Sequence, residues 1–173
     1  QGWSPKCENS SAPEGKWAVI KTSAVQKIEF LANENKLLPD ELEPRQDLVV
    51  NPGDIIVTRA GPRVRCGVTA YVENTRSKLM LCDKVYRFTV KADLGVSKFL
   101  ALILNAPQYL EVIKEMKTGS SDSGMNLTQK KFKELSVNWP SVDEQKEIVR
   151  LVEQYFSFAD TIESQVKKAQ TRV

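Results

Sequence analysis

Residues 141–173 read SVDEQKEIVRLVEQYFSFADTIESQVKKAQTRV, the longest regular pattern in the chain. Ser141 and Glu144 have the spacing of a capping box at the start of a helix. Apolar residues then recur at alternating spacings of four and three, a heptad pattern typical of helices that pair with other helices. The seam comprises Ile148, Val152, Tyr155, Ala159, Ile162, Val166, Ala169 and Val173. The sequence therefore predicts a long coiled-coil-type helix for dimerisation or spacing, and the unbroken pattern predicts that the natural helix continues.

The two halves of this helix differ in the width of their apolar stripe. Leu151, Phe156 and Phe158 widen the stripe in the first half, which we expect to pack on the rest of the protein. The second half narrows to the seam, with polar residues such as Gln165 and Lys167 around it. We therefore expect the second half to pair with another helix, which includes the case of a homodimer.

Residues 1–140 have the patterns of a separate globular part. Short apolar runs, rich in β-branched residues or alternating with polar ones, predict strands at 17–20, 55–58, 67–72 and 84–90. In the last run Tyr86, Phe88 and Val90 share one face, as in a half-buried strand. Proline and glycine punctuate residues 33–53, which are predicted to be a loop.

Three short helices are predicted before the long one. Residues 97–104 are apolar nearly all round, as in a helix at the centre of a core. Pro107 starts a second helix that ends by Gly119, and Thr128 is the expected N-cap of a third. The apolar face of the second helix comprises Tyr109, Val112, Ile113 and Met116. The fold predicted is α+β, with a mixed irregular β-sheet and short helices in residues 1–140 and the long helix in 141–173.

The composition excludes several classes of function. The chain has no histidine, which excludes Ser-His-Asp and Cys-His catalysis within it. Its three cysteines are widely spaced and fit free thiols better than a zinc site or a disulfide framework. No apolar run approaches the roughly 20 residues that span a bilayer, and the first residues are not a signal peptide. We therefore expect a cytoplasmic protein without a metal, and the missing initial methionine suggests a fragment of a longer chain.

The net charge of +3 is unevenly distributed. Residues 58–91 contain eight basic and two acidic residues, whereas residues 28–54 contain two basic and seven acidic ones. Such asymmetry favours one face that binds a polyanion, although charge clusters are also common on ordinary solvated surfaces.

Residues 53–67, GDIIVTRAGPRVRCG, place three arginines on a turn held by two strands. We call residues 59–67 the arginine turn. The guanidinium groups of Arg59, Arg63 and Arg65 are suited to grip phosphate or to pair with guanine. The alternative is a solvated turn whose arginines form salt bridges.

A polar loop at residues 118–126 offers a second set of candidate DNA contacts. Ser121 and Ser123 can donate to phosphates or bases, and Lys130 follows at the start of a helix. The alternative is a mobile loop without a ligand.

Two alternative functions remain open from the residues alone. A metal-dependent nuclease could use Asp40, Glu115 and Lys117, but that chemistry needs the last two on a strand, and here they lie in a helical stretch. A protein-interaction module without DNA specificity could use the same loops and the long helix. The chain lacks a glycine-rich strand-to-helix turn for S-adenosylmethionine, so no cofactor is expected.

Three stretches resemble the specificity (S) subunits of type I restriction-modification systems. They are residues 2–8, GWSPKCE, residues 53–59, GDIIVTR, and the closing run from Gly119 to Val149. The most specific part of that run is Pro140-x-x-x-Glu144-Gln145-x-x-Ile148-Val149.

The resemblance implies a fold and a function beyond those that the residues alone predict. S subunits carry two target recognition domains, each of which reads one half of a split DNA target, joined by two long helices that pair antiparallel. This chain would be one such domain with one helix and no catalytic centre. Its partners would be double-stranded DNA, a second recognition domain, modification (M) subunits that methylate adenine and restriction (R) subunits that cleave DNA. S-adenosylmethionine, ATP and Mg²⁺ would be bound by those partner subunits.

Overall fold

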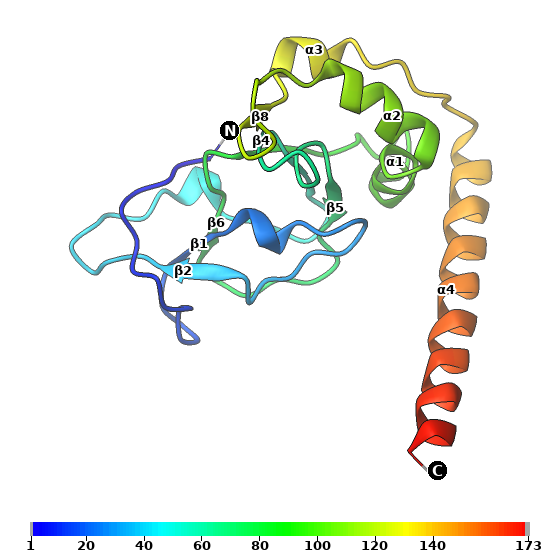
Figure 1. Ribbon diagram of the computed structural model, residues 1–173, viewed down its shortest axis with the longest axis horizontal. Coiled ribbons are helices and arrows are strands. Elements are labelled where there is room, and N and C mark those ends of the chain that lie inside the picture. Colours follow the sequence, from blue (N-terminus) through cyan, green and yellow to red (C-terminus); the bar gives the residue numbers. More distant parts are fainter. Residues whose placement is uncertain (1, 172–173) are drawn as a thin grey trace.

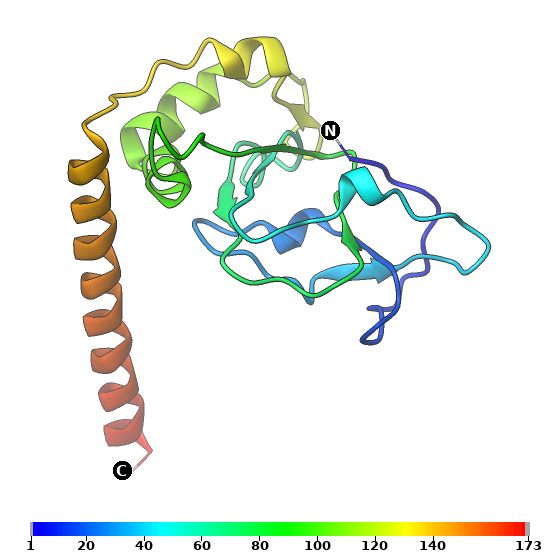
Figure 2. The same cartoon turned by 180° about the vertical axis from the view of Figure 1, so that it is seen from behind.

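The computed structural model describes residues 2–171 and has the predicted α+β architecture. Three small sheets and three short helices form a body, and the long helix α4 (Val142–Gln170) stands at its side (Figure 1). The view from behind shows that α4 separates from the body along most of its length (Figure 2). No helix within residues 2–171 is both long and apolar enough to cross a membrane.

The first sheet has the strand order β2-β1-β6. Strand β1 (Ala18–Ile20) pairs antiparallel with β2 (Asn35–Leu37) and parallel with β6 (Leu79–Met80). The prediction of a loop over residues 33–53 was therefore wrong at β2. Asn35 explains why a polar residue starts this strand, because its buried amide accepts from the Ala12 N–H at 2.9 Å and donates to the Ala32 carbonyl at 2.8 Å.

The central sheet has the order β5-β3-β7 and lies between two hydrophobic cores. Strand β3 (Ile55–Thr58) is buried at all four residues and pairs antiparallel with β5 (Thr69–Tyr71) and β7 (Val85–Phe88). The prediction of a half-buried strand at 84–90 needs correction. Val85 packs in the larger core while Phe88 packs against the smaller one, so β7 is covered on both faces.

A two-stranded ribbon and the short helices enclose the smaller core. The ribbon joins β4 (Ala60–Gly61) to β8 (Met125–Asn126), and the helices are α1 (Ser97–Leu104), α2 (Pro107–Met116) and α3 (Gln129–Lys133). Thr128 caps α3 as predicted. The predicted apolar face of α2 was wrong at Val112, which is exposed. Only Ile113 is fully buried, because Gly67 lets it approach so closely that a Cβ there would lie 2.5 Å from Ile113 Cγ2.

The predicted capping box starts α4: the Ser141 N–H donates to Glu144 Oε2 at 2.9 Å, and Ser141 Oγ accepts from the Glu144 N–H. The expectation that a wide apolar stripe packs the first half on the body was wrong. Leu151, Phe156 and Phe158 are exposed, and the buried residues of α4 are Gln145 and Val149.

Candidate nucleic-acid interface

The structure joins the arginine turn to the polar loop, two segments about 60 residues apart in the sequence. Ala60 pairs with Asn126 in the β4–β8 ribbon. Farther out, the Arg63 N–H donates to the Asp122 carbonyl at 2.7 Å. Asn126 also exchanges backbone hydrogen bonds of 2.8 and 2.7 Å with Thr118, which closes the base of the polar loop. The two candidate DNA-binding segments therefore form one unit.

Arg59 lies inside this unit. Its Nε donates to the Asp83 carbonyl at 2.7 Å, and its Nη1 donates to Asn126 Oδ1 at 3.0 Å. Its guanidinium also lies 5.9 Å from the centre of the Tyr86 ring. These contacts engage the side chain within the protein and favour a role for Arg59 in holding the turn against the polar loop.

Arg63 and Arg65 lie farther out on the turn. Hydrogen bonds of 2.9 Å from the N–H groups of Arg65 and Cys66 to the Pro62 carbonyl shape it. Arg63 is 45% exposed, and its Nε donates to Asp122 Oδ1 at 2.6 Å. Arg65 is half-buried. Because Asp122 is itself 86% exposed, the Arg63 ion pair is open to water and to competition by another anion.

Positive charge gathers behind the turn. Lys117 donates to the Arg63 carbonyl at 3.2 Å, and partial burial lowers the pKa of Lys117 below its usual value. The neighbouring cations Arg63 and Lys114 lower it further. Several cations therefore share one region, which raises the local potential for an incoming anion.

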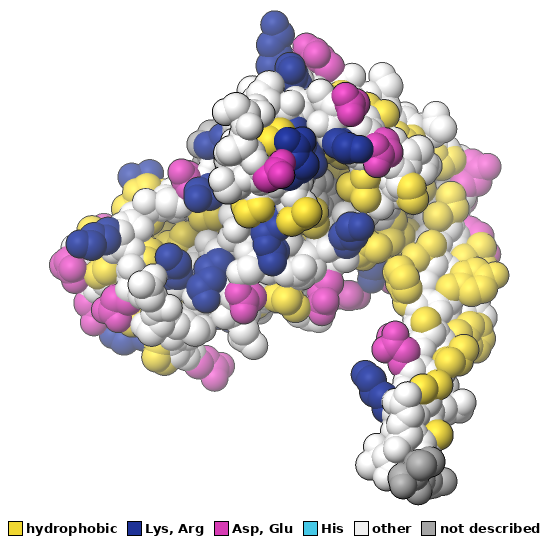
Figure 3. Space-filling view, viewed as in Figure 1, with side chains coloured by type: hydrophobic (Ala, Val, Ile, Leu, Met, Phe, Trp, Pro, Cys, Tyr) yellow, Lys and Arg dark blue, Asp and Glu magenta, His cyan; other side chains and the backbone are white. Residues whose placement is uncertain are grey.

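The remaining predicted contacts lie on the same side of the ribbon. Ser121 and Ser123 are exposed, with their hydroxyl oxygens 3.4 Å apart. Lys130 is exposed on α3, next to Lys131 and Lys133. Figure 3 shows Lys and Arg side chains recurring across the upper and central part of this face.

The nuclease alternative finds no support. Asp40 forms an ion pair with Lys16 at 3.0 Å, whereas Lys117 and Glu115 belong to the end of α2 and the residue after it. Within residues 2–171 no three Asp, Glu or Cys side chains form a group that could hold a metal ion.

The junction between the body and α4 contains functional residues that the sequence patterns did not predict. Gln145 is fully buried, and its Oε1 accepts from the Val96 N–H at 2.8 Å while its Nε2 donates to the Pro140 carbonyl at 2.9 Å. Trp139 Nε1 donates to the Leu94 carbonyl at 2.8 Å. The junction therefore ties the N-terminus of α4, and the residues just before it, to the segment before α1.

An ion pair reinforces this junction farther along the helix. Lys98 Nζ lies 2.6 Å from Glu153 on α4 and 3.2 Å from Glu73 on the body. Partial burial alone would lower the pKa of Lys98, but the hydrogen bonds from the two carboxylates raise it above its usual value. The ammonium group consequently stays charged at neutral pH.

Beyond the junction, the predicted seam of α4 faces solvent. Tyr155 is 69% and Ile162 60% exposed, and Ile148, Ala159, Val166 and Ala169 are also exposed, while Val152 is half-buried. Hydrophobic side chains run along the helix surface (Figure 3). Val173 lies outside the described residues. The rest of the seam forms an apolar face that is open to a partner.

Comparison with known proteins identifies relatives along nearly the whole chain. The model of the type I restriction modification DNA specificity domain matches residues 6–170. The type I restriction enzyme EcoEI specificity subunit of Escherichia coli is 39% identical over 170 residues, which are 98% of this chain and 29% of the relative. The StySPI specificity subunit of Salmonella potsdam is 31% identical over 83% of this chain and 31% of the relative. The EcoKI specificity subunit of Escherichia coli K12 is 32% identical over 70% of this chain and 26% of the relative. The chain thus spans less than a third of the length of these relatives.

Proposed function

Because this chain belongs to the type I restriction modification DNA specificity family, we propose that it recognises one half of a split DNA target. The observation that carries this proposal is the joining of the arginine turn to the polar loop in one exposed, positively charged unit. The chain has no catalytic role of its own. It directs methyltransferase and endonuclease subunits, which bind S-adenosylmethionine, ATP and Mg²⁺, to their site.

Recognition uses two kinds of contact. Lys130 and the serines of the polar loop bind phosphates and set the register of the domain on the duplex. Arg63 exchanges its exposed Asp122 partner for a guanine edge or a phosphate, since a guanidinium can bind either in a bidentate manner. Arg65 lies on the same turn and is the second candidate for base contact. Arg59 contributes by fixing the position of the turn.

Helix α4 supplies assembly. Its exposed seam pairs with the corresponding helix of a second recognition domain, and in the isolated chain it pairs with a second copy. Pairing of two such helices sets the distance between the two half-sites. The M subunits bind to this assembly and the R subunits join it, in the prokaryotic cytoplasm where the DNA lies.

A selection from randomised duplex DNA tests the proposal. The domain is paired with a second recognition domain, assembled with M subunits and selected in parallel with Arg63→Ala, Arg65→Ala and the control Arg150→Ala. Arg150 is an exposed arginine on α4 that pairs with Glu147 and lies outside the proposed interface. We expect a fixed half-site for the wild type and the control, and a relaxed position for an arginine that reads a base.

A different result would support another function. If the intact wild-type assembly enriches no sequence, the domain does not specify DNA. The loops would then serve protein interaction alone.

A further inference from the structure

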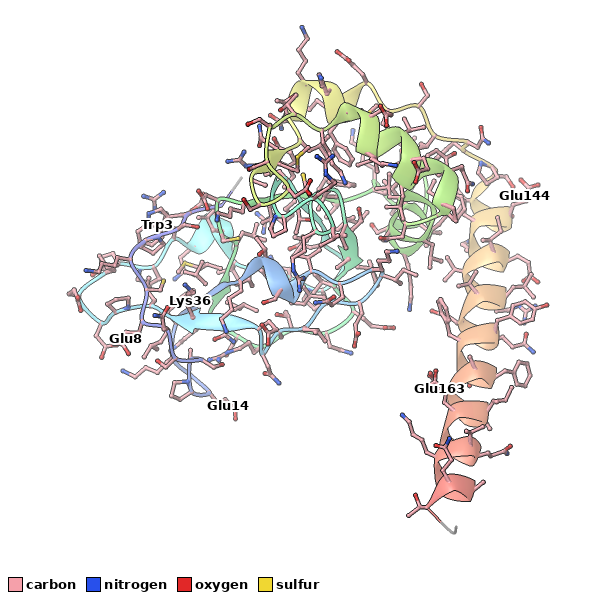
Figure 4. All side chains as sticks on the ribbon, in the orientation of Figure 1. Trp3, Glu8, Glu14, Lys36, Glu144 and Glu163 are labelled. Atoms are coloured by element: carbon pink, nitrogen blue, oxygen red, sulfur yellow. The ribbon has the colours of Figure 1, made fainter. Side chains whose placement is uncertain are left out.

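A hollow of about 330 Å³ lies in the first sheet and has no part in the interface described above. Three lysines from separate segments line it: Lys21 follows β1, Lys36 lies on β2 and Lys84 precedes β7. The hydroxyls of Ser4 and Thr22 are at its wall. Figure 4 labels Lys36 on the N-terminal part of the body, near Trp3 and Glu8.

The hollow carries a net positive charge. Asp83 is the one carboxylate among the described residues that line it, and it is engaged with Ser4 through hydrogen bonds to its side chain and its N–H. Lys21 lies 4.0 Å from Glu34, at the limit of an ion pair. Among residues 2–171 neither Lys36 nor Lys84 has a carboxylate oxygen within 4.0 Å, in contrast to Lys16, Lys98 and Lys146.

The floor of the hollow is fixed. Val19 and Ile20 of β1 and Cys82 are buried in the larger core. Lys36 is the cross-strand partner of Val19, and the Lys21 N–H donates to the Glu34 carbonyl at 2.9 Å, so the pairing of β1 with β2 positions both lysines. The charges are thereby held in place on a rigid sheet.

The hollow adjoins the arginine turn. The Arg59 N–H donates to the Lys84 carbonyl at 2.9 Å, and Arg59 Nε donates to the carbonyl of Asp83, which lines the hollow. The chain around the N-terminus lies beside the β4–β8 ribbon in both ribbon views (Figures 1 and 2). A duplex on the arginine turn would therefore extend toward the three lysines.

We propose that this hollow binds phosphates of the DNA backbone flanking the half-site, an inference that rests on the proposed function. Lysine is a compact point charge on a flexible stem, which suits attraction of a phosphate, whereas reading a base edge favours the planar fork of arginine. The hollow increases affinity and fixes register for any sequence. Specificity stays with the arginine turn and the polar loop.

The test measures how DNA affinity depends on salt. The assembled complex with M subunits binds a fluorescent duplex at about 50–200 mM KCl, as wild type and as the double variant Lys36→Ala/Lys84→Ala. Removal of one phosphate contact reduces the slope of log K against log salt by about 0.9, so the affinity change across this range shrinks about three- to fourfold for each phosphate released. We expect this reduction on cognate and unrelated duplexes alike, with an unchanged selected sequence.

The matched control is Lys16→Ala/Lys146→Ala, which removes the same charge from two lysines that already pair with Asp40 and Asp143. The variant Lys36→Arg/Lys84→Arg keeps the charge and should restore the slope, and circular dichroism checks that each variant is folded. If wild type binds DNA and the test variant has the slope of the control, the hollow is not a phosphate site, and DNA recognition still stands. If inorganic phosphate competes at the hollow while the DNA slope is unchanged, the hollow is a small-anion site only, which overturns the proposal. If wild type binds no DNA, the proposed function itself fails.

Discussion

Replacement of Gln145 by alanine tests whether the junction holds α4 on the body. The substitution removes both hydrogen bonds of the buried amide, to the Val96 N–H and the Pro140 carbonyl. It also empties space beside Gly95, where the two residues are so close that a Cβ on Gly95 would lie 2.6 Å from Gln145 Oε1. The Val96 N–H and the Pro140 carbonyl are then left without the partner that the glutamine supplied.

The cost follows from these hydrogen bonds. Each contributes about 1 kcal/mol net, and a buried partner left without one costs about 1–3 kcal/mol. Since water can reach part of the opened site, we expect a total loss of about 3 kcal/mol in the free energy of unfolding. For a protein of this size, that loss lowers Tm by about 6–12 °C.

Thermal and urea unfolding followed by circular dichroism measure this loss. The control is Gln154→Ala, because Gln154 lies exposed on the same helix and accepts only from Arg150 at 3.3 Å. A loss for Gln145→Ala of less than about 0.5 kcal/mol, equal to that of the control, would refute the view that the amide fixes α4. Gly95→Ala should reproduce the destabilisation through the clash with Trp139 Cζ2 at 2.5 Å.

Further predictions concern the turn, the cap and the thiols. Arg59→Ala should lower Tm by several degrees through loss of its internal hydrogen bonds, whereas Arg63→Ala should leave Tm within about 2 °C and weaken DNA binding; equal Tm values would remove the distinction drawn between them. Ser141→Ala should cost about 1 kcal/mol in urea unfolding, and Ser141→Asp, which can also cap the helix, should recover most of it. At about pH 8 a thiol reagent should label Cys7 well before Cys82, because burial raises the pKa of Cys82 to about 11 and keeps it protonated until the pH approaches that value; labelling of both at one rate would contradict the burial described.

Local patterns predicted the elements that depend on local physics. The capping box, the proline at the start of α2 and the residues of α1 are confirmed, because each depends on a few neighbouring residues. Strand β2 was missed because its three residues, Asn35 to Leu37, lack an apolar alternation and gain their place from pairing with β1.

The candidate site could be predicted in its parts but not in its assembly. The arginines and the serines were identified separately, yet nothing local indicates that Arg63 meets Asp122 or that Arg59 turns inward toward Asn126. Gln145 was missed for a related reason. A glutamine at a helix start normally faces water, and its burial depends on Gly95, about 50 residues earlier.

The arginine turn and the helix junction are fastened to different parts of the molecule. The turn depends on β8 and the polar loop, whereas α4 depends on α1 and the segment before it. Changes in residues 60–65 or 120–123 therefore leave the hydrogen bonds of the junction in place. For heredity, this means that a mutation or an exchange of gene segments can create a new DNA preference while the offspring still build an intact complex.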